Sequence, residues 1–321
     1  MTNEPFPDPP EGIELHRDAP LAQHTYLRVG GPARYLAIPE TPDDLTRLVD
    51  WARRAGLRVR VIGGGSNLLV DDAGVDALVI SLRRAAGGVR FEGEHAIVGA
   101  AMMLPALARA AAGQGLSGLE FAVGIPGSVG GALNSNAGIG DGRSIGPLVE
   151  SVEVLGGRGR RTLPASELRF EYRRSSLRGA GVMVLGATLR LRPRPTGEIE
   201  AEMARLLTHR QATQPTAEPN AGSIFRNPEG DAAGRLIEAA GCKGLASGPA
   251  HVSELHANFI VHDGSARAAD IVALIAELQR RVLAHAQIRL QPEIEWWGDG
   301  ELPPPFAEPA PVEDLGGRAV F

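Results

Sequence analysis

A strand that runs straight into three consecutive glycines constrains this chain more than any other feature. In "LRVRVIGGGSN", residues 57–67, apolar residues alternate with arginines before the glycines begin, which predicts a β-strand followed by a tight loop. Glycines let consecutive backbone N–H groups face an anion without obstruction by side chains. The loop has neither a Walker lysine nor G-x-G-x-x-G spacing, so a phosphate-binding loop and a plain strand turn both stay open. Its residues are Gly63, Gly64, Gly65, Ser66 and Asn67.

A second glycine-rich segment, "GLSGLEFAVGIPGSVGGALNSNAG", spans residues 115–138. Its Pro-Gly pair predicts a turn, and the serine that follows is a suitable N-cap for a short helix. A helix start with exposed amides is an anion site, and small residues let a flat ring lie against the backbone. We favour a ligand wall over a simple crossover loop, because the glycines lie beside asparagine amides. The residues of this wall are Gly124, Pro126, Gly127, Ser128, Gly131, Asn134, Asn136 and Ala137.

Strand and helix patterns alternate through most of the chain. Residues 41–56 predict a helix that Thr41 caps and Gly56 ends. Residues 151–192 are rich in strand patterns, and the prolines at positions 193 and 195 indicate a boundary. Further helices are expected at 104–115, 198–211, 231–241 and 265–287, and further strands at 75–82, 95–102 and 256–264. Residues 1–20 are expected to form a loose arm, and residues 301–321 a proline-rich tail.

Composition excludes several classes of protein. The chain of 321 residues carries a formal charge of −5, so it is a poor nucleic-acid binder overall. Its single cysteine, Cys242, excludes an internal disulfide and a cysteine-rich metal site. No apolar run is long enough to span a bilayer, and the N-terminus lacks the pattern of a signal peptide. We therefore expect a cytoplasmic protein that binds neither membrane nor nucleic acid.

Polar clusters lie outside the glycine segments. In "RFEYRRSSLR", residues 169–178, an arginine beside a tyrosine could clamp a carboxylate or phosphate, although such a run is more often a solvated face. "QPEIEWWG" places Glu293 in a strand pattern. In "PNAGSIFRNP", Ser223 has no neighbouring base, which disfavours acyl transfer. An arginine, a glutamate and a serine without a histidine fit electrophilic activation and protonation better.

Histidines give no sign of a metal centre. His251 and His256 lack the spacing of metal ligands, so we expect no metal.

The order of these motifs resembles the UDP-N-acetylenolpyruvoylglucosamine reductase, or MurB, family over residues 20–298. The second glycine-rich segment and "AGSIFRNP" are quite specific to that family. The resemblance implies an α+β FAD-binding fold of the vanillyl-alcohol-oxidase (PCMH) type in two subdomains, and a C-terminal α+β substrate-binding domain. It also implies reduction of the enolpyruvyl ether of UDP-N-acetylglucosamine to UDP-N-acetylmuramate in peptidoglycan precursor synthesis, with FAD and NADPH. The implied parts are 21–193 with an internal boundary near 85, and 194–300, in an expected monomer.

The resemblance assigns roles to individual residues. The family's catalytic arginine falls on Arg173, its proton-donating serine on Ser223 and its catalytic glutamate on Glu293. The FAD contacts fall on the two glycine-rich segments. Positions expected to touch the substrate fall on Tyr172, Asn227 and Lys243.

This chain departs from the family pattern in places. Trp296 and Trp297 replace a usual pair of small apolar residues. Some members carry a substrate-clamping tyrosine on an extra loop, which none of the three tyrosines here matches, so we expect the shorter type. Two alternatives stay open: a flavin oxidase of the same fold, and a non-catalytic nucleotide-binding module. A covalently held flavin indicates the first, and a colourless protein indicates the second.

Overall fold

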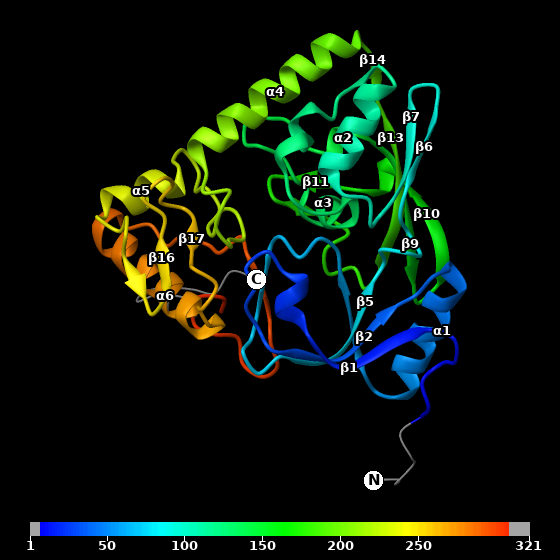
Figure 1. Cartoon of the computed structure of the whole chain (residues 1–321), viewed down its shortest axis with the longest axis horizontal. Helices are drawn as coiled ribbons and strands as arrows, with labels where there is room; N and C mark the ends of the chain where they lie inside the picture. Colours follow the sequence, from blue (N-terminus) through cyan, green and yellow to red (C-terminus); the bar gives the residue numbers. More distant parts are fainter. Residues whose placement is uncertain (1–6, 308–321) are drawn as a thin grey trace, which may run out of the picture.

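A computed structural model of the chain describes residues 7–307, and its first layer is a four-stranded sheet (Figure 1). In this sheet β1 (Glu14–Pro20) pairs antiparallel with β2 (Pro32–Ile38). The central strand β5 (Val75–Ser81) pairs parallel with β2 and with β3 (Arg58–Ile62). A helix forms the crossover connection from β2 to β3, and β5 lies between these two strands in the sheet. The strands predicted at 57–62 and 75–82 are therefore confirmed.

Residues 14–20 do not form the expected loose arm, because they are the edge strand of this sheet. Their register runs from Glu14 opposite Ile38 to Pro20 opposite Pro32. The segment is mostly polar and carries no local strand signal, and it is a strand because its backbone pairs with that of β2. At the other end, Gln279 Nε2 donates to the Pro305 carbonyl at 3.1 Å, so the start of the expected tail packs on the protein. The expectations for residues 1–6 and 308–321 lie outside the described residues.

Helix α1 (Pro42–Arg54) begins and ends where its sequence signals predict. The Thr41 side chain accepts from the Asp44 N–H, and the Asp44 carboxylate accepts from the Thr41 N–H, which is a complete capping box. The helix buries Leu45, Leu48 and Trp51 against the first sheet and its surroundings. Burial of such an apolar stripe supplies most of the stability of a helix of this length.

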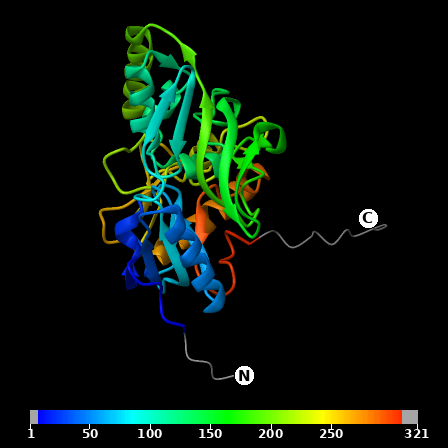
Figure 2. The same ribbon diagram turned by 90° about the vertical axis from the view of Figure 1, so that its right-hand side faces the viewer.

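A second, five-stranded antiparallel sheet lies above the first in Figure 2. Residues 81 and 89 bound the connection between the two sheets, on either side of the boundary that we predict near 85. Helices α2 (Leu104–Gly113) and α3 (Val129–Ser135) lie beside this sheet, and α2 confirms the helix expected at 104–115. In spatial order its strands are β10 (Gly159–Pro164), β9 (Val149–Gly156), β13 (Met183–Arg190), β7 (His95–Gly99) and β6 (Val89–Glu92).

The C-terminal elements form a separate lobe, on the left in Figure 1. Helix α4 (Thr196–Thr213) precedes this lobe in the chain. It packs on the part of the protein that contains the two sheets, because Ile199 and Met203 belong to the hydrophobic core of that part. The boundary near 193 stays a prediction. The lobe holds α5 (Ala233–Ala239) and α6 (Ala268–Ala286), which confirm two expected helices. Its strands are β15 (Ala246–Ser247), β16 (Ala250–Val252) and β17 (Ile260–Val261). Of the strand expected at 256–264, only the two residues of β17 form a strand.

Short strand pairs complete the fold. They are β4 (Leu68–Val70) with β18 (Glu295–Trp297), β8 (Leu116–Ser117) with β14 (Arg192–Pro193), and β11 (Phe170–Glu171) with β12 (Arg174–Ser175).

The C-terminal lobe is fixed to the first sheet by polar contacts as well as by packing. The Asp72 carboxylate accepts from the N–H groups of Ala268 and Ala269 at 2.9 and 3.1 Å, so a loop of the first sheet caps α6. The ring of His262 is fully buried and donates to the Leu27 carbonyl at 2.7 Å, because its other nitrogen accepts from a backbone N–H. The described helices include none that is both long and apolar enough to cross a membrane.

Candidate active site

The two glycine-rich segments pack against each other, backbone to backbone. A Cβ atom on Gly64 would lie 2.7 Å from the Cα of Gly127, a separation that no side chain tolerates. Ser66 Oγ donates to the Pro126 carbonyl at 2.9 Å and holds the two segments in register. The contact explains why the loop after β3 and the segment before α3 both need glycine.

Ser128 begins helix α3 as the sequence predicts. Its Oγ accepts from the Gly131 N–H at 3.4 Å, and a Cβ atom on Gly63 would lie 2.2 Å from that oxygen. Within residues 7–307, the N–H groups of Gly64 and Gly65 have no hydrogen-bond acceptor. Free N–H groups beside a glycine wall form a concave anion site, so these residues fit the diphosphate of a dinucleotide.

Arg173 lies at the tip of the β11–β12 hairpin in a left-handed backbone conformation, with φ of +54°. A non-glycine residue there carries strain that the surrounding structure must hold. Its Nη1 donates to the Gly138 carbonyl at 2.8 Å, and its Nε lies 2.7 Å from Glu293 Oε1. The contact with Glu293 is an ion pair rather than an aligned hydrogen bond, because Arg173 Nε has no acceptor in good geometry.

Backbone pairing brings Ser223 to Glu293. The Glu293 N–H donates to the Ile224 carbonyl at 2.7 Å, and the Arg226 N–H donates to the Gln291 carbonyl at 2.9 Å. The segment that holds Ser223 therefore runs beside the segment that holds Glu293.

The side chain of Asn67 extends this arrangement to the first glycine loop. Its Nδ2 donates to the Glu293 carbonyl at 3.0 Å. The loop, the serine and the glutamate thus form one connected unit.

Glu293 has an unusual electrostatic environment. Burial raises the pKa of its carboxyl above the ordinary value, and the positive charges of Arg173, Arg226 and Arg178 oppose that rise. A buried carboxyl that keeps a proton more readily than usual can donate a hydrogen bond to an anion. The side chain is largely enclosed, since only 18% of it is exposed.

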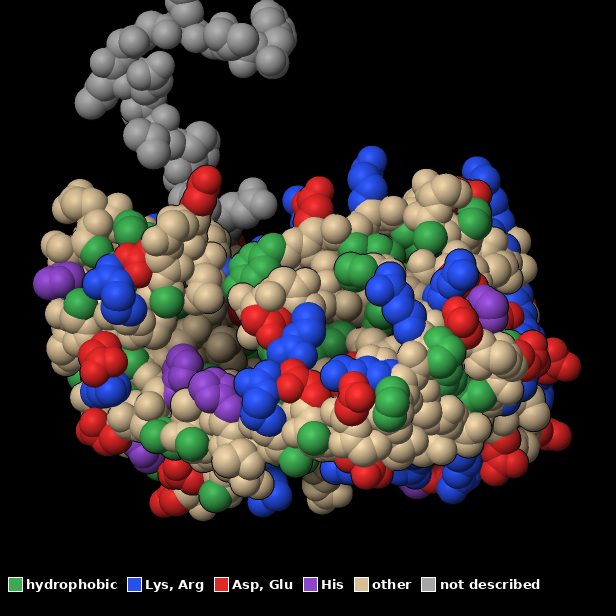
Figure 3. Space-filling model, turned by 90° about the horizontal axis from the view of Figure 1, so that it is seen from above, with side chains coloured by type: hydrophobic (Ala, Val, Ile, Leu, Met, Phe, Trp, Pro, Cys, Tyr) green, Lys and Arg blue, Asp and Glu red, His purple; other side chains and the backbone are tan. Residues whose placement is uncertain are grey.

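One continuous cavity of about 1500 Å³ connects these residues. Its size exceeds that of a site for one drug-sized ligand, so it can hold a dinucleotide and a second ligand together. Figure 3 shows the surface hollowed between the C-terminal lobe and the rest of the protein. The sequence-predicted residues that line it are Gly63, Gly64, Gly65, Ser66, Asn67, Pro126, Gly127, Ser128, Gly131, Asn134, Ala137, Tyr172, Arg173, Ser223, Asn227 and Glu293.

The structure places three predicted residues outside the cavity lining. The Gly124 carbonyl accepts a hydrogen bond from Arg210, whose side chain lies between it and the cavity. Asn136 ends α3 with φ of +48°, and its side chain donates to the Glu171 carbonyl at 2.8 Å. Lys243 pairs with Glu238 at 2.8 Å. In each case the side chain or carbonyl already has a hydrogen-bond partner within the protein, and the sequence does not reveal that partner.

The two remaining substrate candidates are more open. Tyr172 is 54% exposed at the hairpin tip, with Arg173 against its ring at 5.5 Å. The Asn227 oxygen accepts from the Ala233 N–H at 3.0 Å, which leaves its NH₂ group to donate to a ligand.

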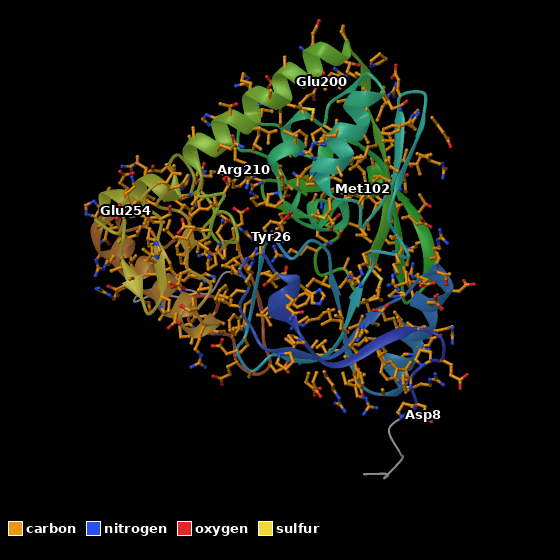
Figure 4. All side chains as sticks on the ribbon, in the orientation of Figure 1. Asp8, Tyr26, Met102, Glu200, Arg210 and Glu254 are labelled. Atoms are coloured by element: carbon orange, nitrogen blue, oxygen red, sulfur yellow. The ribbon has the colours of Figure 1, made fainter. Side chains whose placement is uncertain are left out.

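Sequence reasoning missed cationic residues of the cavity. Arg210, in the last turn of α4, is a lining residue whose pKa is lowered by burial. Figure 4 places Arg210 and Tyr26 at the centre of the molecule, between the lobes, whereas Glu200 and Glu254 lie at its outer edge. Arg60 and Trp297 also line the cavity. An arginine in an ordinary helical or strand pattern carries no local signal of the cavity that it faces.

Comparisons with known proteins agree with this geometry. Residues 214–297 match the family described as "UDP-N-acetylenolpyruvoylglucosamine reductase, C-terminal domain", and residues 33–162 match "FAD binding domain". A UDP-N-acetylenolpyruvoylglucosamine reductase of Moorella thermoacetica is 45% identical over 90% of this chain and 95% of its own length. One of Synechococcus sp. WH7803 is 46% identical over 88% of this chain and 93% of its own length.

The chain belongs to the UDP-N-acetylenolpyruvoylglucosamine reductase family.

A solved structure supports the family assignment at the level of the fold. The UDP-N-acetylenolpyruvylglucosamine reductase (MurB) of Thermus caldophilus superposes with a TM-score of 0.76 and 39% identity, over 89% of this chain and 99% of that one. The chain described here is thus an FAD-dependent oxidoreductase with an α+β FAD-binding fold and a C-terminal domain of the reductase type.

Proposed function

We propose that the protein reduces the enolpyruvyl ether of UDP-N-acetylglucosamine to UDP-N-acetylmuramate, with NADPH as the reductant. The observation that carries this proposal is the convergence of Arg173, Ser223 and Glu293 on one cavity whose walls fit a flavin dinucleotide. Bound FAD supplies the hydride chemistry, which it draws from NADPH. A cytoplasmic location and a monomeric state belong to the same proposal.

Arg173 and Glu293 bind the carboxylate of the enolpyruvyl group. When the terminal carbon of that group accepts hydride, negative charge develops on the neighbouring carbon and on its carboxylate. The guanidinium of Arg173 is held in place by the Gly138 carbonyl, so it stabilises this charge without reorganising. The raised pKa of Glu293 supports its acting in the protonated form, as a hydrogen-bond donor to the same carboxylate.

Ser223 donates a proton to the carbon where the negative charge develops. A hydroxyl is a very weak acid, but the intermediate is a strong base, so position matters more than acidity. The lactyl product gains one hydride and one proton, and the serine recovers its proton from solvent. Neither transfer requires a histidine relay, consistent with the absence of a local base beside Ser223.

Anaerobic absorption spectra of the purified protein test the proposal. NADPH alone should bleach the flavin, and the enolpyruvyl sugar nucleotide should then restore its oxidised spectrum. A flavin that stays with the protein after acid precipitation would instead favour an oxidase with a covalent cofactor. A colourless protein that does not take up FAD would overturn the proposal.

A further inference from the structure

Trp297, at the end of β18, belongs both to the core of the protein and to the cavity wall. It is 3% exposed and packs in the core of the first sheet, and it is one of the residues that line the cavity. Its indole N–H donates to Glu295 Oε1 at 2.9 Å, which fixes the orientation of the ring.

Arg60 lies over this ring. Its guanidinium carbon is 5.1 Å from the centroid of the Trp297 ring, within the range of a cation–π contact. The residue belongs to β3, just before the triple-glycine loop, and it lines the same cavity. Trp297 therefore serves as a platform that holds the arginine against the cavity wall.

The charge of Arg60 has no counter-ion of its own within residues 7–307. The two carboxylates whose charges reach it are engaged by other arginines, Asp299 by Arg58 and Glu295 by Arg178 at 3.5 Å. Burial lowers the pKa of Arg60, and the nearby charge of Arg58 adds to that effect. A half-buried guanidinium with this environment is stabilised when an anion binds beside it.

We propose that Arg60, held on Trp297, is a side-chain ligand for the diphosphate of the bound FAD. The backbone N–H groups of Gly64 and Gly65 offer the same anion a second set of donors from the following loop. Glu295 and its partner Arg178 act as the support that keeps the indole in place. The inference rests on the binding of FAD and does not depend on the reaction that follows.

Release of FAD from the purified holoprotein tests the assignment. The variant Arg60→Met removes the charge and keeps the length of the side chain. Arg90→Met is its control, because Arg90 is an exposed strand arginine that pairs with Glu92 at 2.9 Å and does not line the cavity. Flavin fluorescence after ultrafiltration, at a series of salt concentrations, gives the dissociation constant of FAD for each protein.

We expect Arg60→Met to raise the dissociation constant of FAD by about tenfold or more, and to weaken its dependence on salt. Arg90→Met should bind FAD as the wild type does. Equal dissociation constants for the two variants would overturn the inference. If the wild type itself carried no FAD, the proposed function would fail as well, so the two failures are distinguishable.

Two further measurements locate the anion and the platform. An unchanged affinity for FAD with a raised KM for NADPH, or for the UDP-sugar, would assign Arg60 to that ligand and contradict the proposal. Trp297→Phe keeps a ring beneath Arg60 and should retain FAD within about threefold of the wild type. Trp297→Leu should lose FAD affinity to the same extent as Arg60→Met. If Trp297→Leu does not fold, the comparison of Arg60→Met with Arg90→Met decides.

Discussion

Arg173 Nε lies 2.7 Å from Glu293 Oε1, although one residue lies at the tip of the β11–β12 hairpin and the other in the C-terminal lobe. Both residues line the cavity, and their ion pair joins the two parts of the chain there. It is held on one side by the Gly138 carbonyl and on the other by the pairing of Glu293 with Ile224. The relationship makes each residue sensitive to changes in the other.

Replacement of Arg173 by lysine should slow the oxidation of reduced flavin by substrate by about tenfold to a hundredfold. Lysine keeps the positive charge but loses the planar guanidinium that contacts Glu293 and that we propose to bind a substrate carboxylate. Rapid-mixing absorption measurements follow this step directly. Arg174→Lys is the control from the same hairpin, because Arg174 is exposed and does not line the cavity. An equal effect in both variants would contradict the role of Arg173.

Ser223→Ala should separate the two halves of the reaction. NADPH should reduce the flavin at the rate of the wild type, while reoxidation by substrate should slow by about a hundredfold or more, because no other proton donor occupies that position. Single-turnover spectra distinguish the two steps. Ser265→Ala, in an exposed turn beside Asp263, is the control. Normal turnover of Ser223→Ala would show that another group supplies the proton.

The raised pKa of Glu293 predicts a pH-dependent difference in stability between the wild type and Glu293→Gln. A carboxyl whose folded pKa exceeds its unfolded pKa contributes stability that is complete below the unfolded value of 4.5 and is lost as pH rises through the folded pKa. Glutamine does not titrate. The free energy of unfolding of the variant should therefore improve relative to the wild type from pH 4 to about pH 7, as urea unfolding at several pH values can measure.

A constant difference across that pH range would mean that the arginines around Glu293 cancel the effect of burial. The sign of the change is the test, since the absolute stability of Glu293→Gln also includes the loss of its ion pair with Arg173.

Gly65→Ala should destabilise the protein strongly and reduce FAD binding. Gly65 has φ of +63°, and a Cβ atom there would lie 2.0 Å from the His24 carbonyl oxygen. Gly93→Ala is a matched control, because Gly93 has φ of +59° with no atom within 4 Å of the added carbon. The control should cost only the backbone penalty of about 1–2 kcal/mol. Thermal unfolding and flavin content of both variants measure the difference. Similar losses of stability in the two variants would show that the His24 carbonyl moves easily to make room for the added carbon.

Asp72→Ala should lower the free energy of unfolding by about 1–2 kcal/mol, because it removes the cap of α6 and its favourable charge at the helix N-terminus. Denaturant unfolding gives this value. Asp263→Ala, which removes only a local turn contact to Ser265, should have a smaller effect. An unaltered stability of Asp72→Ala would show that packing alone fixes the C-terminal lobe.

Local sequence signals were sufficient for much of the fold. The capping box of α1, the glycine stop at position 56 and the cap at Ser128 are interactions between residues close in the chain, so their pattern predicts their structure. The turns within the two glycine-rich segments were predictable for the same reason, but the contact between the segments was not. The strand at 14–20 was not, because an edge strand with polar side chains depends on a partner that only the folded chain provides.

The sequence by itself determined which residue types were available to the site: glycines where two backbones meet, and an arginine, a serine and a glutamate in recognisable motifs. Tertiary structure alone decided which of them share the cavity. It turned Gly124, Asn136 and Lys243 to partners elsewhere, and it brought Arg60 and Arg210 to the cavity wall. The physical reason is that local hydrogen bonds follow chain neighbours, whereas burial, counter-ions and shared cavities arise between segments that meet only on folding.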